Sequence, residues 1–97
     1  MATYIHLLNW TEQGAKNVKE TVNRTEKNRQ MIEKLGGRLL NIFWTQGGYD
    51  VVAITEWPDE GSAVAFSLAL ASSGNVRSET LRAFSAEEMD SFLKKIP

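Results

Sequence analysis

Cysteine is absent from the sequence of 97 residues. The chain therefore has no thiol nucleophile, no thiolate ligands for an iron–sulfur cluster and no disulfide framework. An excess of either charge is also lacking, since 11 basic and 12 acidic residues give a formal net charge of −1. A protein that neutralises many phosphates needs a basic surface, so this balance argues against a nucleic-acid partner.

Long apolar runs are missing as well. No stretch approaches the roughly 18 apolar residues of a membrane-spanning helix, and the first residues lack the basic and apolar segments of a signal peptide. We therefore expect a cytoplasmic protein with no membrane partner. The length is below that usual for two domains, so we expect a single domain over residues 1–97.

The segments that are present alternate between strand-like and helix-like patterns. Apolar and β-branched segments predict strands at 4–10, 38–45, 50–57 and 76–84. Helical spacing of apolar residues predicts helices at 12–35, at 60–72 and from 86 onward. Thr25 and Arg29 interrupt the apolar stripe of the first helix, so this helix either extends past its sheet or meets something polar there.

This order of elements, β-α-β-β-α-β with a C-terminal helix, predicts an α+β domain with the ferredoxin-like fold. We expect an antiparallel four-stranded sheet whose first and third strands lie side by side at the centre and run parallel. Ser85 and Glu88 have the spacing of a capping box and begin the last helix. The apolar residues that this helix is expected to bury are Met89, Phe92, Leu93 and Ile96.

Alternate side chains of a strand point to opposite faces of its sheet. One set is wholly apolar and is expected under the helices: Ile5, Leu7, Leu40, Ile42, Val52, Ile54, Leu81 and Ala83. The other set is mixed and is expected on the open face: Tyr4, His6, Leu8, Leu39, Asn41, Phe43, Thr45, Val51, Ala53, Thr55, Ser78, Thr80, Arg82 and Phe84. A large exposed patch of this kind is typical of an interface or a ligand groove. Two such faces packed together form a dimeric α/β barrel, so we expect a homodimer or a higher homo-oligomer.

Three blocks of the sequence resemble the GYD-domain family, a group of small bacterial and archaeal proteins. The blocks are residues 8–14, residues 48–50, and residues 74–77 followed by 80–84. The likeness covers essentially the whole chain. It implies a ferredoxin-like fold of the dimeric α/β-barrel type. It implies no activity and no catalytic residue, because the family has no established activity.

Five residues are candidates for a ligand-binding site: Tyr4, His6, Phe43, Tyr49 and Arg82. His6, the sole histidine, is either a general base or haem ligand in a barrel cavity, or a hydrogen-bonded residue of a dimer interface. Arg82 either holds an anion through its guanidinium group or pairs with Glu56 or Glu79 across a subunit boundary.

Tyr49 and Asp50 follow two glycines in a predicted turn. We expect Asp50 to accept hydrogen bonds from turn amides and Tyr49 to pack across the end of the sheet. The alternative makes Tyr49 a proton donor or a stacking group at the mouth of a barrel. In either case we expect Tyr49 at the same end of the sheet as Tyr4 and Arg82.

The leading hypothesis is a homo-oligomeric protein that binds a small organic molecule between open sheet faces, without a cofactor. The second is a cofactor-independent oxygenase or isomerase, with His6 as the base and Arg82 holding an anionic intermediate. The third is a purely structural assembly module. No cluster of histidines or carboxylates has the spacing of metal ligands, so we expect no metal. The sequence leaves open whether the protein is an enzyme.

Overall fold

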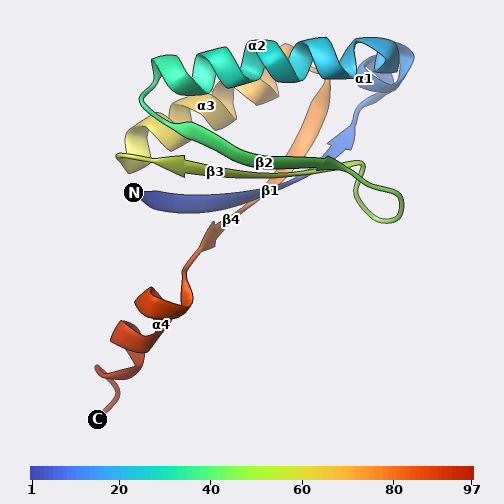
Figure 1. Ribbon diagram of the computed structural model, residues 1–97. Helices are drawn as coiled ribbons and strands as arrows, with labels where there is room; N and C mark the ends of the chain where they lie inside the picture. The colour runs from blue at the N-terminus through green and yellow to red at the C-terminus, as the bar shows by residue number, and fades with distance from the viewer.

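A four-stranded sheet forms the body of the computed structural model, which describes residues 1–97 (Figure 1). The strands are β1 (Ala2–Trp10), β2 (Arg38–Trp44), β3 (Val51–Trp57) and β4 (Val76–Ala83), in the spatial order β2-β3-β1-β4. The helices are α1 (Glu12–Lys16), α2 (Thr21–Lys34), α3 (Glu60–Ser73) and α4 (Ala86–Leu93), with the 3₁₀ turn η1 (Val18–Glu20) before α2. The predicted ferredoxin-like α+β arrangement is confirmed.

All neighbouring strands are antiparallel, including β1 and β3 at the centre of the sheet. The expectation that these two strands run parallel is wrong. The helical crossover makes β1 and β2 parallel, and the hairpin between β2 and β3 then turns β3 against β1. The hairpin turn therefore lies beside the end of β1, where the amide of Asp50 donates to the carbonyl of Leu8 at 2.9 Å.

The segment expected as one helix over 12–35 is interrupted. Thr11 is the N-cap of α1, and its hydroxyl accepts a hydrogen bond from the amide of Gly14. Asn17 ends α1 with a φ of −103° and a ψ of 27°, and its carbonyl accepts from Arg24 Nη1 at 2.7 Å. This bend lets α1 pack at the end of β1 while α2 lies across the sheet (Figure 1).

Helices α2 and α3 cover one face of the sheet (Figure 1), and the two faces are the reverse of those expected. The covered face carries His6 and Thr55, which are 2% and 1% exposed. The wholly apolar set lies mainly on the other face, where Ile5 pairs with Ile54. The reason is that Ile32 of α2, Phe66 of α3 and their apolar neighbours fill the core, so the covered strand positions accommodate small and polar side chains.

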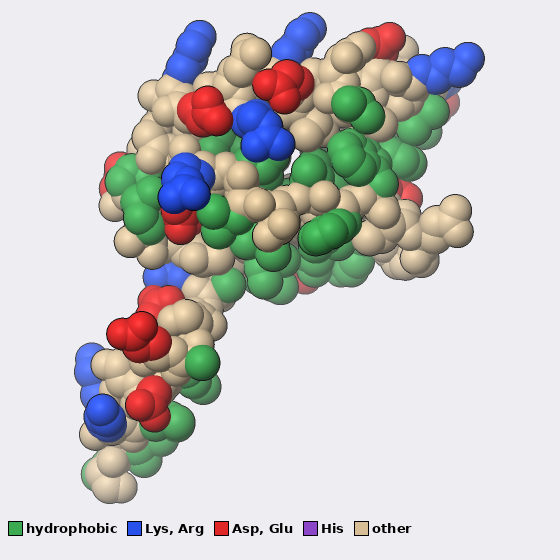
Figure 2. Space-filling view, viewed as in Figure 1, with side chains coloured by type: hydrophobic (Ala, Val, Ile, Leu, Met, Phe, Trp, Pro, Cys, Tyr) green, Lys and Arg blue, Asp and Glu red, His purple; other side chains and the backbone are tan.

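Helix α4 projects away from the body of the molecule (Figures 1 and 2). The predicted capping box is present, since Ser85 and Glu88 bond each other's backbone amides. The expectation that α4 buries its apolar side chains is wrong for the single chain, in which Phe84 meets Phe92 edge to face, with 5.1 Å between the ring centroids. The apolar side chains of α4 and of the residues after it are 40–67% exposed: Met89, Phe92, Leu93 and Ile96. No helix combines the length and apolar character needed to cross a membrane.

Candidate functional site

The five candidate residues do not form one site. Tyr4 and Arg82 are paired across β1 and β4 on the helix-covered face, which also holds His6. Phe43 pairs with Val52 on the open face and is 57% exposed. Tyr49 lies at the opposite end of the sheet from Tyr4, because β3 runs antiparallel to β1. The register shift in β2 between Leu39 and Asn41 puts Phe43 on the open face, and the antiparallel direction of β3 puts Tyr49 at the far end. Residues that were expected to lie together are thus separated.

Arg82 holds the base of the α4 segment. Its guanidinium lies over the rings of Phe84, at 4.5 Å, and of Tyr4, at 5.6 Å. Its Nη1 atom donates to the carbonyls of Thr3 and Ala83, and its Nη2 atom lies 3.8 Å from Glu88. The Nη1 donors of this guanidinium are therefore engaged within the chain, close to the start of α4.

The two carboxylates named as partners for Arg82 are also engaged elsewhere. Glu56 pairs with Arg38 on the neighbouring strand at 3.2 Å. Glu79 accepts a hydrogen bond of 2.6 Å from the hydroxyl of Tyr49, and this bond to the carboxylate raises the pKa of Tyr49. Tyr49 therefore remains a protonated donor at neutral pH.

His6 lies in the core and links three strands. Its Nε2 atom is 2.8 Å from the hydroxyl oxygen of Thr55 on β3, and its Nδ1 atom is 3.2 Å from that of Thr80 on β4. Burial lowers the pKa of His6 from 6.5 to about 4, so the ring is neutral at pH 7. A neutral imidazole with both nitrogens bound to hydroxyls fits a structural role better than that of a general base at neutral pH.

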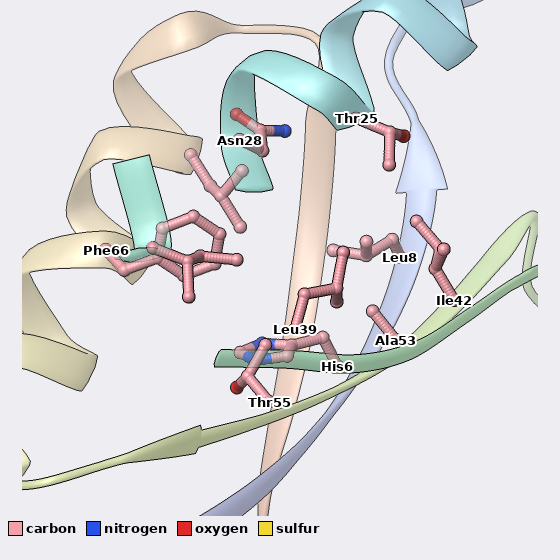
Figure 3. Close-up of a pocket in the computed structure, with 11 residues that line it drawn as sticks. His6, Leu8, Thr25, Asn28, Leu39, Ile42, Ala53, Thr55 and Phe66 are labelled. Carbon is pink, nitrogen blue, oxygen red and sulfur yellow. The ribbon is translucent and has the colours of Figure 1, made fainter. Parts of the chain in front are cut away.

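A cavity lies beside His6, between α2 and the sheet (Figure 3). The centre of a water molecule can occupy about 40 Å³ of this cavity. Thr25 and Asn28 of α2 line it opposite Ala53 and Thr55 of β3. Asn28 was not predicted as a site residue, although the polar break in the helix stripe at Thr25 marked this part of α2.

Residues 8–14, 48–50 and 74–77, which belong to the three sequence blocks that resemble one family, meet at one end of the molecule. The Asp50 carboxylate accepts from the amide of Trp10 at 3.0 Å, which joins the hairpin turn to the end of β1. The amide of Thr11 donates to the carbonyl of Asn75 at 3.0 Å, which joins β1 to the turn before β4. We call this contact of residues 8–14, 48–50 and 74–77 the block junction. It gives structural roles to Thr11, Gly14 and Asp50.

Replacement of Asp50 by alanine tests this reading of the turn. The variant leaves the half-buried amide of Trp10 without its acceptor, and we expect a loss of about 1–3 kcal/mol in the free energy of unfolding. Tyr49→Phe, which removes only an exposed hydroxyl bond, should lower the free energy of unfolding by less than Asp50→Ala does. Urea unfolding of both variants measures the difference, and equal losses would contradict the assignment.

A family model for the GYD domain matches residues 4–93. The chain belongs to the GYD-domain family. A relative from Thermus thermophilus, named "Glutamine synthetase and cystathionine beta-lyase binding protein", is 30% identical to this GYD protein over 95 residues, which are 97% of this chain and 100% of the relative. A crystal structure of a protein from Thermus thermophilus matches with a TM-score of 0.55 and 25% identity, covering 89% of this GYD protein and 96% of that chain. In this GYD protein, no three His, Asp or Glu side chains form a group that could hold a metal ion.

Proposed function

We propose that this GYD protein is a homo-oligomeric binding protein, in which two copies pack their open sheet faces together and the assembly binds a partner enzyme. The observation that carries the proposal is an uncovered apolar surface across all four strands. We call it the open apolar face, and its residues are Ile5, Leu7, Phe43, Val52, Ile54 and Leu81. An apolar patch of this extent, left bare on one chain, is typical of a protein interface.

A second copy of the chain suits this face because the charges around it do not oppose the approach of an identical surface. The rim of the face carries two positive and two negative side chains: Arg38, Arg77, Glu56 and Glu79. The rim therefore has no net charge, and a two-fold axis brings the apolar centre of one copy onto the same centre of the other. A ligand between two such faces would meet mainly apolar groups, since Tyr4, His6 and Arg82 lie on the covered side.

The exposed α4 segment supports assembly as well. Its apolar side chains gather on one side of the projecting helix (Figure 2). The chain itself offers them no partner beyond Phe84. An amphipathic helix held away from its own domain gains stability by burying this side against another protein surface.

The partner enzyme is proposed from the relative in Thermus thermophilus, whose name states that it binds glutamine synthetase and cystathionine beta-lyase. The alignment covers the whole of that relative and 97% of this chain. We therefore take these two enzymes as the partners to test first.

Replacement of Ile54 by glutamate tests self-association. A carboxylate at the centre of the open apolar face loses its hydration on packing, so we expect the dissociation constant of the oligomer to rise roughly 100-fold. Size-exclusion chromatography with light scattering at micromolar concentrations measures this change. Leu68→Glu on α3, where the side chain is 66% exposed and lies away from the open apolar face, is the matched control and should leave the mass unchanged. A monomeric wild-type protein, or an unchanged mass for Ile54→Glu, would overturn the proposal.

Binding to the enzymes is a separate measurement. Purified glutamine synthetase and cystathionine beta-lyase from the organism that encodes this chain are immobilised in turn, and binding of the wild-type protein is followed by biolayer interferometry. We expect binding to at least one enzyme, weakened by removal of residues 86–97. Absence of binding to both would refute the choice of partner and leave the result on self-association standing.

A further inference from the structure

The cavity between α2 and the sheet lies wholly within one chain and on the side away from the open apolar face. Figure 3 shows the side chains that converge on it from α2, α3 and the strands. A volume of about 40 Å³ open to the centre of a water molecule admits roughly three waters, or an organic group of similar size.

The cavity exists because α2 presents short polar residues toward the sheet. Thr25, Asn28 and Ile32 follow one another at helical spacing and all line the space, but only Ile32 is apolar and fully buried. Across from them, Ala53 contributes only a methyl group. Leucine or isoleucine at positions 25 and 28 would complete the stripe and fill the space. The polar break that the sequence shows at Thr25, together with Asn28, therefore leaves this space unfilled.

The polar groups of the cavity can form hydrogen bonds with an uncharged ligand. The hydroxyl of Thr25 donates to the carbonyl of Thr21 at 3.0 Å, so its oxygen is left to accept a bond. No hydrogen bond within the chain engages the half-buried amide group of Asn28, which offers both a donor and an acceptor. No acidic, lysine or arginine side chain lines the space, so a charged ligand would lose hydration without a counter-charge.

We infer that this cavity is a binding site for a small uncharged molecule with an apolar body and one amide, ketone or hydroxyl group. The body contacts Leu39, Phe66 and Leu70, while the polar group bonds to Asn28 and Thr25. The site is independent of the proposed self-association, because every lining residue belongs to one chain.

Matched small probes test the inference by NMR. Acetamide, acetone and 2-propanol are titrated into ¹⁵N-labelled protein, with acetate and methylammonium as charged counterparts of similar size. We expect saturable shifts at the amides of Thr25, Asn28, Ala53 and Thr55, with dissociation constants in the millimolar range for ligands this small. Acetate and methylammonium should bind at least about 10-fold more weakly.

The variants Asn28→Leu and Thr25→Val test whether the polar groups of the cavity bind a ligand or the cavity is only an unfilled space. Asn28→Leu is expected to weaken acetamide binding by about 10-fold or more and to leave the melting temperature unchanged or higher, because it fills the cavity with apolar volume. Asn23→Leu, on the exposed side of the same helix, is the matched control and should leave binding unchanged. Thr25→Val, nearly isosteric, should weaken binding while preserving the fold.

Three results would overturn the inference. They are shifts that do not saturate or lie elsewhere, equal binding of charged and uncharged probes, and unchanged binding in both Asn28→Leu and Thr25→Val. The Ile54→Glu variant should bind acetamide as the wild type does. If that variant is monomeric and still binds, the site stands apart from the interface.

Discussion

Gly14→Ala is expected to lower the free energy of unfolding by about 3 kcal/mol or more. A Cβ atom at this buried position would lie 2.0 Å from the carbonyl oxygen of Asn75. The obstruction is backbone, so α1 and the turn before β4 must move apart. That movement breaks the bond from the amide of Thr11 to Asn75 and opens the block junction.

Gly48→Ala is the matched control, because a Cβ atom there meets no heavy atom within 4 Å and the backbone has no positive φ. Its unfolding free energy should stay within about 0.5 kcal/mol of the wild type. Denaturant titrations followed by tryptophan fluorescence compare the three proteins. Similar stabilities for both variants would refute the close packing assigned to the block junction.

Acidification is expected to destabilise the wild-type protein by about 3 kcal/mol through His6 alone. The pKa of His6 is about 4 in the folded chain, compared with 6.5 as the ordinary value. Between these values the unfolded chain binds a proton that the folded chain does not. Stability therefore falls as the pH drops from about 6.5 to 4, and this contribution stops changing below pH 4.

The His6→Gln variant isolates the effect of histidine from that of the carboxylates. It has no group to titrate at this position, so its unfolding free energy should fall less between about pH 7 and pH 4.5 than that of the wild type. Chemical denaturation at a series of pH values measures the difference. Parallel curves for the two proteins would mean that His6 is not held neutral by burial.

Element order, the capping box and the fold class were predictable because they depend on local patterns. Strand direction was not predicted correctly: β1 and β3 lie side by side but antiparallel, since the hairpin reverses the chain. This single error moved Tyr49 to the wrong end of the sheet. The pattern of alternation separated the two faces of β1, β3 and β4, but not which face the helices cover. In β2 it failed, because a register shift between Leu39 and Asn41 puts Leu39 and Ile42 on the same face.

The face was misjudged because the more apolar set was assumed to be the core. In the fold, Trp57 is fully buried and packs with Phe66 at 5.4 Å between ring centroids. Such large side chains supply the apolar volume of the core. Thr55 and His6 can therefore be buried among them, because they form a hydrogen bond with each other. The helices cover one face rather than the other because of packing between residues that are distant in the sequence. A local sequence pattern does not encode this packing. The candidate site was accordingly divided, and only the polar break at Thr25 marked the cavity.

The block junction also constrains the order in which the chain can fold during synthesis. β1 lies between β3 and β4, so its outer edge stays unpaired until β4 has left the ribosome. Thr11 and Gly14 likewise lack their contact with Asn75 until that residue, more than sixty positions later in the chain, has been synthesised. A nascent chain that ends before β4 therefore holds an open strand edge and an incomplete junction, and its native pairing is completed only near the end of translation.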